Sequence, residues 1–438
     1  MQSPAPMPRR EFLRRSRTWS LATGALFVAP SVFLNRTRAQ TGENPSDLIR
    51  VGIIGTGGQG RANMTTPTMI KHVVAVCDVD QTHRAEAQKQ VREKTGVEAR
   101  SYGDYRRLLE DKEIDAVLIG TPDHWHTLPA IHACQAGKDV YVEKPLTLTI
   151  VEGQALVKAA RYYKRIVQCG SQQRSWPDEK FRRACEYVRS GRIGDVKTVR
   201  VGLPGVNWTK DPLVPDSAPP PELDYDLWLG PAPVRPYNKH RVHYYFRFFW
   251  DYSGGQMTNW GAHHLDIAQW GLGMDDSGPL EVTAHADFDP DKRFEVPGWF
   301  EINYQYANGV TVTCGQNHRI GTTFEGQDGI IYVDRGRLES SVKGAITDPL
   351  GAEDVRLPVS KDHHQNWFDS IKSRKPPICD VAIGHRSATV CHLGNIAVQT
   401  GRRLKWDPVN EQIVGDPVGI KQYSYDYRKP WELPIIPA

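Results

Sequence analysis

The spacing of apolar residues along the chain changes near residue 170. Before that point, short apolar runs of strand length are separated by longer stretches with helical spacing. The apolar runs lie at 50–54, 72–77, 114–119, 139–142 and 166–169, and the helical stretches at 81–94, 128–136 and 151–163. Strands that alternate with helices predict a parallel sheet covered on both faces, with ligands at the carboxyl ends of the strands. Residues 49–170 are therefore predicted to form a doubly wound α/β domain.

The second part of the chain shows a period of two instead. Apolar and polar residues alternate in four segments, at 197–201, 281–287, 299–306 and 310–316. Such alternation is typical of antiparallel strands with one buried face. Because helical spacing returns at 364–373 and 382–400, residues 171–400 are predicted to form an α+β domain with an open, mainly antiparallel sheet. Residues 401–438 are expected to be a C-terminal tail.

A Pro-rich segment at 204–236 interrupts the second domain. It carries Trp208, Tyr225 and Trp228 and is too long for a plain connector. Loops of this length in compact domains are often binding loops, but a solvated surface excursion fits the composition equally well. Both interpretations stay open at the level of sequence.

The N-terminus carries a targeting pattern. The pair Arg9-Arg10 and the following Phe12-Leu13 precede an apolar run at 21–34 that is too short and too interrupted to span a bilayer. Together with the small residue Ala39, this pattern predicts a twin-arginine signal peptide over 1–39, followed by a linker over 40–48. The expected partner is the twin-arginine export machinery and the expected location is the periplasm or another exported site. An uncleaved signal would leave a membrane tether.

The net charge of +4 over 438 residues originates in this leader. Residues 1–39 hold seven arginines and one acid, so the remainder keeps 48 of the 55 basic and 50 of the 51 acidic residues, a net charge of −2. A nucleic-acid partner is therefore not expected. The seven cysteines are scattered without a C-x-x-C pair, which argues against a disulfide framework or a thiolate zinc site.

A glycine motif follows the first strand directly and opens the first helix. Gly55 permits a tight turn, Gly57 lets the backbone approach a pyrophosphate, and Gly60 allows close helix packing. The N–H groups of Gly58 and Gln59 lie at the start of that helix, where phosphates are bound. The first domain is thus predicted to be a Rossmann domain that binds a dinucleotide.

Asp78 ends the second strand, eighteen positions after Gly60. A carboxylate at this place accepts hydrogen bonds from the ribose hydroxyls and repels a 2′-phosphate. The sequence therefore favours NAD over NADP. Arg84 lies nearby and keeps NADP as an alternative.

Two further motifs fall at the carboxyl ends of predicted strands. Glu143-Lys144-Pro145 follows the strand at 139–142, and the turn from Thr121 to His126 follows the strand at 114–119. A lysine there can hydrogen-bond a substrate hydroxyl and, with a lowered pKa, help to move its proton. We expect His126 to cap the nicotinamide pocket.

Together with the glycine motif and the later antiparallel domain, these motifs resemble the Gfo/Idh/MocA oxidoreductase family over residues 48–400. The resemblance implies a nicotinamide dinucleotide in the first domain, a sugar-type substrate on the second, and a homo-oligomer formed through the second sheet. It implies a catalytic or substrate-orienting role for Lys144. Cofactor contacts are expected from Gly55, Gly57, Gly58, Gln59, Gly60, Asp78, Thr121, Pro122, His126, Glu143 and Lys144.

In that family a helix of the second domain presents an Asp and, four residues later, a His that serves as acid/base. This chain has Asn259 and His263 at that spacing, which places them on one face of an α-helix. An amide can orient an imidazole or a hydroxyl but cannot raise a histidine pKa as a carboxylate would. The expected catalytic residues are therefore Lys144, His263 and Asn259.

Other polar residues are weaker candidates. Arg174 and His264 are expected to meet substrate oxygens, although a structural salt bridge for Arg174 and helix packing for His264 explain them as well. His124 and His126 lack nearby Cys or Glu partners, so no metal site is expected.

The sequence as a whole indicates an exported NAD(P)-dependent oxidoreductase that acts on a carbohydrate or polyol hydroxyl. Because free dinucleotide is scarce outside the cytoplasm, the cofactor is expected to stay bound and to be recycled in place. One alternative is a redox-neutral, NAD-dependent enzyme that cleaves a glycoside or epimerises a sugar. Another is a non-catalytic carbohydrate-binding protein that retains the nucleotide, and Asn259 keeps this alternative open. Fold alone does not separate the three.

Overall fold

The computed structural model describes residues 48–207 and 212–437. The expected signal peptide and nearly all of the linker lie outside these residues. Residues 49–438 group into one compact unit by their contacts. Within the described residues, every helix is too short or too polar to cross a membrane.

The first sheet has six strands that are all parallel, in the order β3-β2-β1-β4-β5-β6. The chain order reverses beside β1, and in open α/β sheets this switch point is where ligands bind. The prediction of a doubly wound sheet is confirmed. The strands are β1 (Val51–Ile54), β2 (Val73–Cys77), β3 (Arg100–Tyr102), β4 (Ala116–Ile119), β5 (Asp139–Val142) and β6 (Val167–Cys169).

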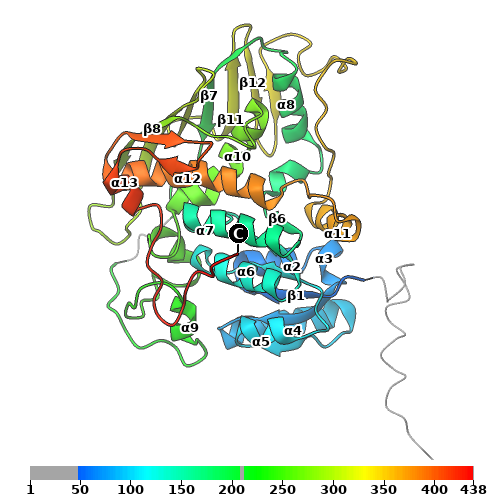
Figure 1. Cartoon of the computed structure of the whole chain (residues 1–438), viewed down its shortest axis with the longest axis vertical. Helices are drawn as coiled ribbons and strands as arrows, with labels where there is room; N and C mark the ends of the chain where they lie inside the picture. The colour runs from blue at the N-terminus through cyan, green and yellow to red at the C-terminus, as the bar shows by residue number, and fades with distance from the viewer. Residues whose placement is uncertain (1–47, 208–211, 438) are drawn as a thin grey trace, which may run out of the picture. The chain divides into compact units, whose positions relative to one another are not determined.

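Helices cover both faces of this sheet (Figure 1). Local capping sets several of their ends: Asp80 accepts the N–H groups of Thr82 and His83 at the start of α4, and Thr149 forms a capping box with Glu152 on α7. The helices between the strands are α2 (Gly58–Met64), α3 (Pro67–Ile70), α4 (Gln81–Thr95), α5 (Tyr105–Glu110), α6 (Thr127–Gln135) and α7 (Ile150–Tyr162), with a 3-10 turn η4 (Asp123–Trp125).

The second sheet has nine strands, in the order β13-β12-β11-β7-β10-β9-β8-β14-β15. Its pairings are antiparallel except for β7 with β10, which confirms the mainly antiparallel prediction. The strands are β7 (Val196–Gly202), β8 (Glu281–Asp287), β9 (Trp299–Gln305), β10 (Thr311–Gly315), β11 (Gly321–Gly326), β12 (Ile330–Val333), β13 (Leu338–Ser340), β14 (Leu404–Asp407) and β15 (Gln412–Ile413).

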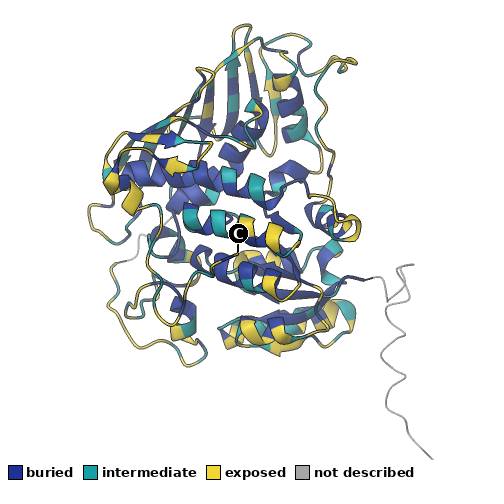
Figure 2. Ribbon diagram, in the orientation of Figure 1, coloured by how far each residue is buried: buried dark blue, intermediate teal, exposed yellow. Residues whose placement is uncertain are grey.

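Helices pack against one face of this sheet, and its strands carry both buried and partly exposed residues (Figures 1 and 2). Along β9, Phe300, Ile302 and Tyr304 are buried while the residues between them are not. The remaining helices are η5 (Gln172–Ser175), α8 (Lys180–Arg189), α9 (Tyr225–Leu229), η6 (His243–Phe248), the π-helix η7 (Met257–Gly261), α10 (Ala262–Leu272), α11 (His363–Ser373), α12 (Val381–Thr400) and α13 (Pro417–Lys421).

Two segments do not lie in the part of the fold that the predicted domain boundaries assign to them. Residues 401–438 are not a tail, because Leu404 on β14 pairs with Val282 on β8 and extends the second sheet. Helix α11, placed by sequence in the second domain, packs Trp367 and Phe368 against the first sheet instead.

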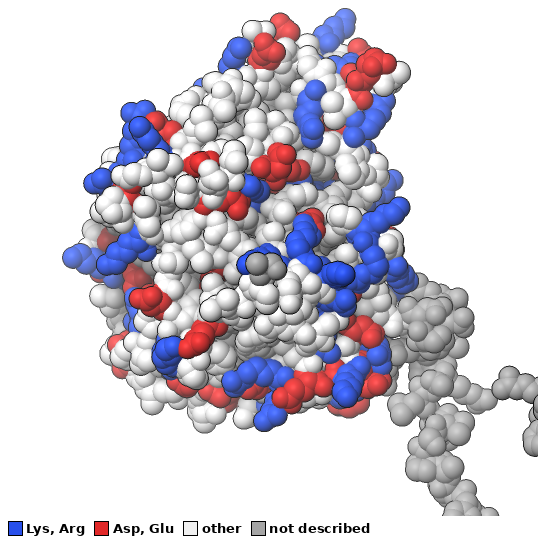
Figure 3. All heavy atoms as spheres, in the orientation of Figure 1, with Lys and Arg blue, Asp and Glu red and all other residues white. Residues whose placement is uncertain are grey.

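Basic and acidic side chains both occur over the face shown in Figure 3.

Candidate active site

A cavity of about 740 Å³ lies at the carboxyl ends of the first sheet's strands and extends to the second domain. Most of the residues that the sequence singled out line this cavity, although they come from two different domains. The predicted residues that line it are Gly55, Gly57, Gly58, Gln59, Asp78, Thr121, Pro122, His126, Glu143, Lys144, Asn259 and His263.

The glycine turn has the shape that a pyrophosphate requires. Gly55 has φ +83°, and a Cβ on Gly60 would lie 1.9 Å from the Gly55 carbonyl oxygen, so these two positions hold the turn closed. A Cβ on Gly58 would meet nothing within 4 Å, and one on Gly57 would meet only the His83 ring, at 3.5 Å. The hydroxyl of Thr121, which lines the cavity, is buried without a partner among the described residues. The glycine turn therefore leaves open space for a dinucleotide, and the Thr121 hydroxyl in the turn after β4 is a polar group without a partner in the described residues.

Asp78 is fixed at the end of β2 by three donors. Its Oδ2 accepts from the N–H (2.7 Å) and the hydroxyl (3.1 Å) of Thr56, and its Oδ1 accepts from the N–H of Asp80 at 3.0 Å. Arg84 donates to the backbone carbonyl of Asp78 at 2.9 Å. The carboxylate is thus held in the cavity lining at the place where ribose hydroxyls are bound in such domains, and this position favours NAD.

The Pro-rich segment reaches the nucleotide end of the cavity. Its residues 222–224, named here the strap, pair with the turn after β2: Gln81 donates its N–H to Glu222 O at 2.9 Å, and Asp224 donates its N–H to Val79 O at 3.1 Å. Trp228 farther along the segment lines the cavity. Of the two interpretations left open by sequence, the binding loop is the one that the structure supports.

A carboxylate and two imidazoles meet beside the strap. Ligand atoms of Asp80, His83 and His243 all lie within 4.8 Å of one another, and the two rings are 4.8 Å apart. Among the described residues, they are the group of three His, Cys, Asp or Glu side chains whose donor atoms lie close enough together to hold a metal ion. Asp80 already caps α4, and all three residues line the cavity.

His126 ties two turns together at the nicotinamide end. Its Nδ1 lies 2.7 Å from Pro145 O and its Nε2 lies 3.0 Å from Thr121 O. The ring lines the cavity, as expected, but both nitrogens face backbone carbonyls. His126 therefore shapes the pocket by joining the turns after β4 and β5.

Glu143 is held within a polar network under the cavity. Its Oε1 accepts from Asn63 Nδ2 at 2.6 Å and from Gln172 Nε2 at 2.7 Å. Gln172 lines the cavity beside it, a position that the sequence did not predict. Because the carboxylate is committed to these amides, its part is to fix the strand end that carries Lys144.

Lys144 points across the cavity to the second domain. Its Nζ donates to the backbone oxygen of Asn259 at 3.0 Å and to the side-chain Oδ1 at 3.1 Å. Burial lowers the pKa of Lys144, and repulsion from Arg247 and Arg335 lowers it further, against the attraction of nearby carboxylates. A positioned amine with a lowered pKa can exchange a proton with a substrate hydroxyl.

His263 presents a neutral imidazole to the same space. Its side chain is buried, and its Nδ1 has no hydrogen-bond partner among the described residues. Burial, with added repulsion from Lys144 and Arg335, holds the pKa of His263 well below 6.5. The ring is therefore unprotonated at neutral pH, the form that a general base requires.

The expected pairing of Asn259 with His263 is wrong. Residues Met257–Gly261 form a π-helix, so the four-residue α-helical spacing does not apply. The Asn259 amide is used elsewhere: Oδ1 accepts from Lys144, and Nδ2 donates to Gln256 Oε1 at 3.0 Å. Asn259 orients the lysine and not the histidine.

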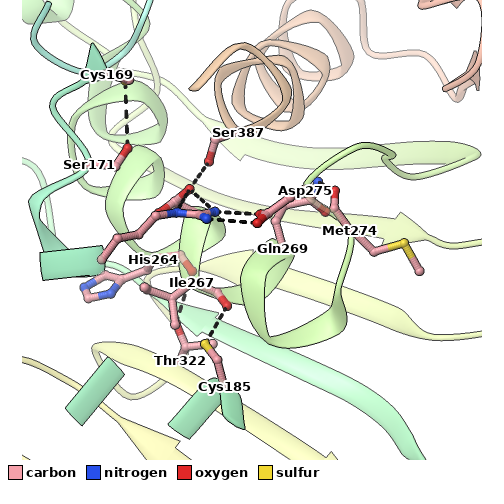
Figure 4. Close-up of polar contacts among 12 residues, drawn as sticks. Cys169, Ser171, Cys185, His264, Ile267, Gln269, Met274, Asp275, Thr322 and Ser387 are labelled. Carbon is pink, nitrogen blue, oxygen red and sulfur yellow. Dashed lines mark hydrogen bonds and ion pairs between the residues drawn. The ribbon is translucent and has the colours of Figure 1, made fainter. Parts of the chain in front are cut away.

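Arg174 does not bind substrate, in contrast to the prediction. Its side chain lies outside the cavity lining and is 2% exposed. The guanidinium forms hydrogen-bonded ion pairs with Asp266 at 2.8 Å and with Asp275 at 2.6 Å, and Ser387 donates to Asp266 (Figure 4). A buried guanidinium requires such partners, and they satisfy its charge within the protein.

His264 is also corrected from a substrate residue to a packing residue. It is 1% exposed, is not part of the cavity lining, and stacks on Trp260 with ring centroids 5.8 Å apart. Burial lowers the pKa of His264 to about 3. The ring stays neutral and supports Trp260, which does line the cavity.

Several lining residues were not found from the sequence. They include Trp176, Trp260, Arg247 and Arg335. The aromatic-rich run at 243–250 was a usable signal for Arg247, because it follows the Pro-rich segment. Arg335 follows β12 and reaches the cavity only through the tertiary fold.

Two family models match consecutive parts of the chain. Residues 49–171 match the oxidoreductase family's NAD-binding Rossmann fold, and residues 186–433 match its C-terminal alpha/beta domain. The second match runs through β14 and β15, in agreement with their place in the sheet. The nucleotide of the first domain is NAD.

Named relatives agree with this assignment. The myo-inositol 2-dehydrogenase of Thermotoga maritima is 31% identical over 82% of this chain and 99% of its own length. An alpha-N-acetylgalactosaminidase of Shewanella oneidensis is 31% identical over 35% of this chain. The structure of an aldose-aldose oxidoreductase from Caulobacter crescentus, complexed with glycerol, superimposes with a TM-score of 0.60 at 20% identity, over 82% of this chain and 99% of that one.

Other curated relatives match over shorter stretches. The chain spans about half the length of some of them, 54% in one case, and 36% of the Shewanella protein. The family models, in contrast, cover both domains. The first match includes Lys144 and the second includes His263, and both residues line the cavity. The chain belongs to the Gfo/Idh/MocA family of oxidoreductases.

Proposed function

We propose that the protein is an NAD-dependent oxidoreductase that acts on a hydroxyl group of a carbohydrate or polyol. The observation that carries this proposal is the meeting of Lys144, held by Asn259, with the neutral ring of His263 at the end of a cavity that begins at the glycine turn. The myo-inositol activity of the full-length Thermotoga relative supports a polyol-type substrate.

The residues divide the work by their chemistry. Gly57, Gly58 and Asp78 bind the dinucleotide, which supplies a hydride acceptor when bound. Lys144 donates a hydrogen bond to the substrate hydroxyl oxygen, and His263 accepts the hydroxyl proton as the carbonyl forms. Trp176 and Trp260 contribute apolar surface to the cavity lining.

We further propose that the cofactor stays bound through the catalytic cycle. The strap pairs with the turn after β2 by two backbone hydrogen bonds, next to the carboxylate that binds the ribose. Dissociation of the nucleotide then requires the strap to move. Slow release suits an exported enzyme, since the exterior supplies little dinucleotide.

The export itself is proposed from Arg9-Arg10 and the apolar run at 21–34. A variant with both arginines replaced by lysine should accumulate inside the cell, while the parent is found in the periplasmic fraction. Equal distribution of the two proteins would contradict export by this route.

A second candidate is a redox-neutral reaction that cleaves a glycoside, in which the hydride returns to the same substrate. The similarity to the Shewanella glycosidase favours it, although that match covers the smaller part of both chains. Aryl glycosides distinguish the candidates, because only this reaction releases phenol without net reduction of the nucleotide. A protein that binds sugars without either turnover would be a non-catalytic binding protein.

We also propose a homo-oligomer formed through the open face of the second sheet, which carries partly exposed polar side chains such as Glu301, Asn303 and Thr313. Light scattering should give a mass that is a multiple of the 49.4 kDa chain or of its signal-cleaved form. Reversing the charge of an open-face residue should lower that mass.

The nucleotide assignment is tested by replacing Gly57 with valine. The new side chain would enter the space left for the pyrophosphate, so nucleotide binding should be lost while the far-ultraviolet circular dichroism is retained. Gly205→Val is a control, because a Cβ there meets nothing within 4 Å and the residue lies outside the cavity lining. Normal binding by the Gly57 variant would overturn the site.

A further inference from the structure

The substrate end of the cavity holds three cations that no carboxylate neutralises. Lys144, Arg247 and Arg335 line the cavity, and none of them has an ion-pair partner within 4.0 Å among the described residues. Arg174 and Arg235, in contrast, are each paired with a carboxylate, Arg174 with Asp266 and Arg235 with Glu295. Arg335 is exposed and Arg247 is half-buried, so neither arginine needs a counter-charge for the fold, but the positive charge that they share in one pocket attracts an anion from outside the chain.

Arg335 is positioned by aromatic rings. Its guanidinium carbon lies 4.6 Å from the ring centroid of Trp260 and 5.4 Å from that of Trp176. It makes no hydrogen bond with any residue in the described part of the chain, so its donors are free. Stacking of this kind holds a guanidinium plane in place while its N–H edge stays available to a carboxylate.

Arg247 is arranged in a similar way on η6. Its guanidinium carbon lies 4.7 Å from the Phe246 ring centroid and 4.8 Å from that of Tyr244, and one of its five donors is used by the Tyr244 carbonyl at 2.9 Å. Both arginines act electrostatically on Lys144, which places them around the same space.

The nearby carboxylates do not cancel this charge. Asp123 accepts a hydrogen bond from Ser253 and forms no ion pair with these three cations among the described residues. Glu143 is committed to the amides of Asn63 and Gln172. Asp78 and Asp80 lie at the opposite, nucleotide end.

We propose that the substrate is a sugar acid, whose carboxylate is bound by Arg335 at the mouth of the cavity with Arg247 adding to the attraction. This inference rests on the proposed function and narrows its substrate class. A planar carboxylate matches the fork of a guanidinium and accepts two parallel hydrogen bonds from it. The residue that determines specificity is then Arg335, while Lys144 and His263 serve the reacting hydroxyl.

The test compares ligands that differ only in charge. Glucuronate and galacturonate are compared with the corresponding neutral sugars and with glucuronamide, which has nearly the same shape, by calorimetric binding to the NAD-loaded protein and by kcat/KM. We expect the acids to bind about 10- to 100-fold more tightly than their neutral partners, as a charge-assisted pair contributes. Glucose 6-phosphate tests whether a phosphate ester is preferred instead.

Two variants assign the effect to one residue. Arg335→Met should remove the preference for the acids, measured as the ratio of the calorimetric affinities for each acid and its neutral partner, and Arg335→Lys should restore part of that ratio. Arg337→Met is the matched control, because this exposed arginine lies two residues away and outside the cavity lining, beside Glu339. The control should keep the full preference, and the nucleotide content of each variant reports whether it is folded.

Three results would overturn the inference. They are equal affinity for acids and neutral sugars, a preference for the phosphate ester over the acids, and a preference for acids that survives Arg335→Met in a folded, NAD-loaded protein. Failure of the proposed function is distinguishable, since it would appear as absent nucleotide or absent turnover with every sugar. In that event the binding comparison alone still decides whether an acid is preferred.

Discussion

Asn259 determines how the lysine of this site titrates. Its Oδ1 lies 3.1 Å from Lys144 Nζ, where a carboxylate would stabilise the ammonium form. Asn259→Asp should therefore raise the pKa of Lys144, and the fall in kcat/KM at high pH, where the lysine loses the proton that it donates to the substrate oxygen, should move to higher pH. Asn308→Asp, in the exposed turn after β9, should leave the profile in place. A profile that does not move in the Asn259 variant would separate the two residues.

Lys144 and His263 carry the proton transfer in the proposed mechanism. Lys144→Ala and His263→Ala should each lower kcat by about 10²- to 10⁴-fold, the range for general acid/base groups, with NAD still bound. Lys197→Ala and His285→Ala, on strands of the second sheet and outside the cavity lining, serve as controls with the same residue types. Retention of full activity in either active-site variant would remove that residue from the mechanism.

At the scale of elements, the ion pair of Arg174 joins η5 to helix α10, which follows the π-helix of the site. Arg174→Met leaves Asp266 buried without its counter-charge, and this should lower the free energy of unfolding by about 3–5 kcal/mol, measured in urea. Arg200→Met breaks the exposed pair with Glu325 and should cost less than about 1 kcal/mol. Equal costs would contradict the structural role of Arg174.

The same variant makes a pH prediction. Burial already raises the pKa of Asp266, and loss of the arginine raises it further. Above its raised pKa in the folded protein, the buried Asp266 carboxyl is ionised without a counter-charge, and this lowers the free energy of unfolding. At low pH the carboxyl is protonated in both the folded and the unfolded state, so this loss of stability disappears. The stability deficit of Arg174→Met should therefore shrink as the pH is lowered, whereas a deficit that stays constant would indicate lost packing.

Elements with a clear period were predictable from the sequence, and their tertiary partners were not. The strand at 281–287 is found at those bounds, and the helix at 81–94 ends one residue later. The pairing of Asn259 failed because a single π-turn changes the direction of a side chain without changing the apolar pattern. The partner of Arg174 at Asp275 lies 101 residues along the chain, beyond the reach of local spacing.

At the scale of the whole molecule, the catalytic groups become complete only where the two domains meet. Lys144 ends a strand of the first sheet, whereas Asn259, His263 and Arg335 come from the second domain. The strap extends from the second domain to the nucleotide end of the first. The strap lies beside the nucleotide end of the cavity, and this position is the basis on which we propose slow release of the cofactor.

The most direct measurement follows the nicotinamide absorbance of the purified, extensively dialysed protein without added nucleotide. Denaturation of one sample identifies the bound nucleotide, and addition of glucuronate or myo-inositol to another shows whether it is reduced in place. The structure predicts NAD in near-equimolar amount, reduction on addition of a suitable sugar, and no reduction in Lys144→Ala. Protein that neither retains NAD nor binds it when it is supplied would contradict the nucleotide site. Loss of all activity on dialysis, restored by NAD with free NADH accumulating, would contradict cofactor retention.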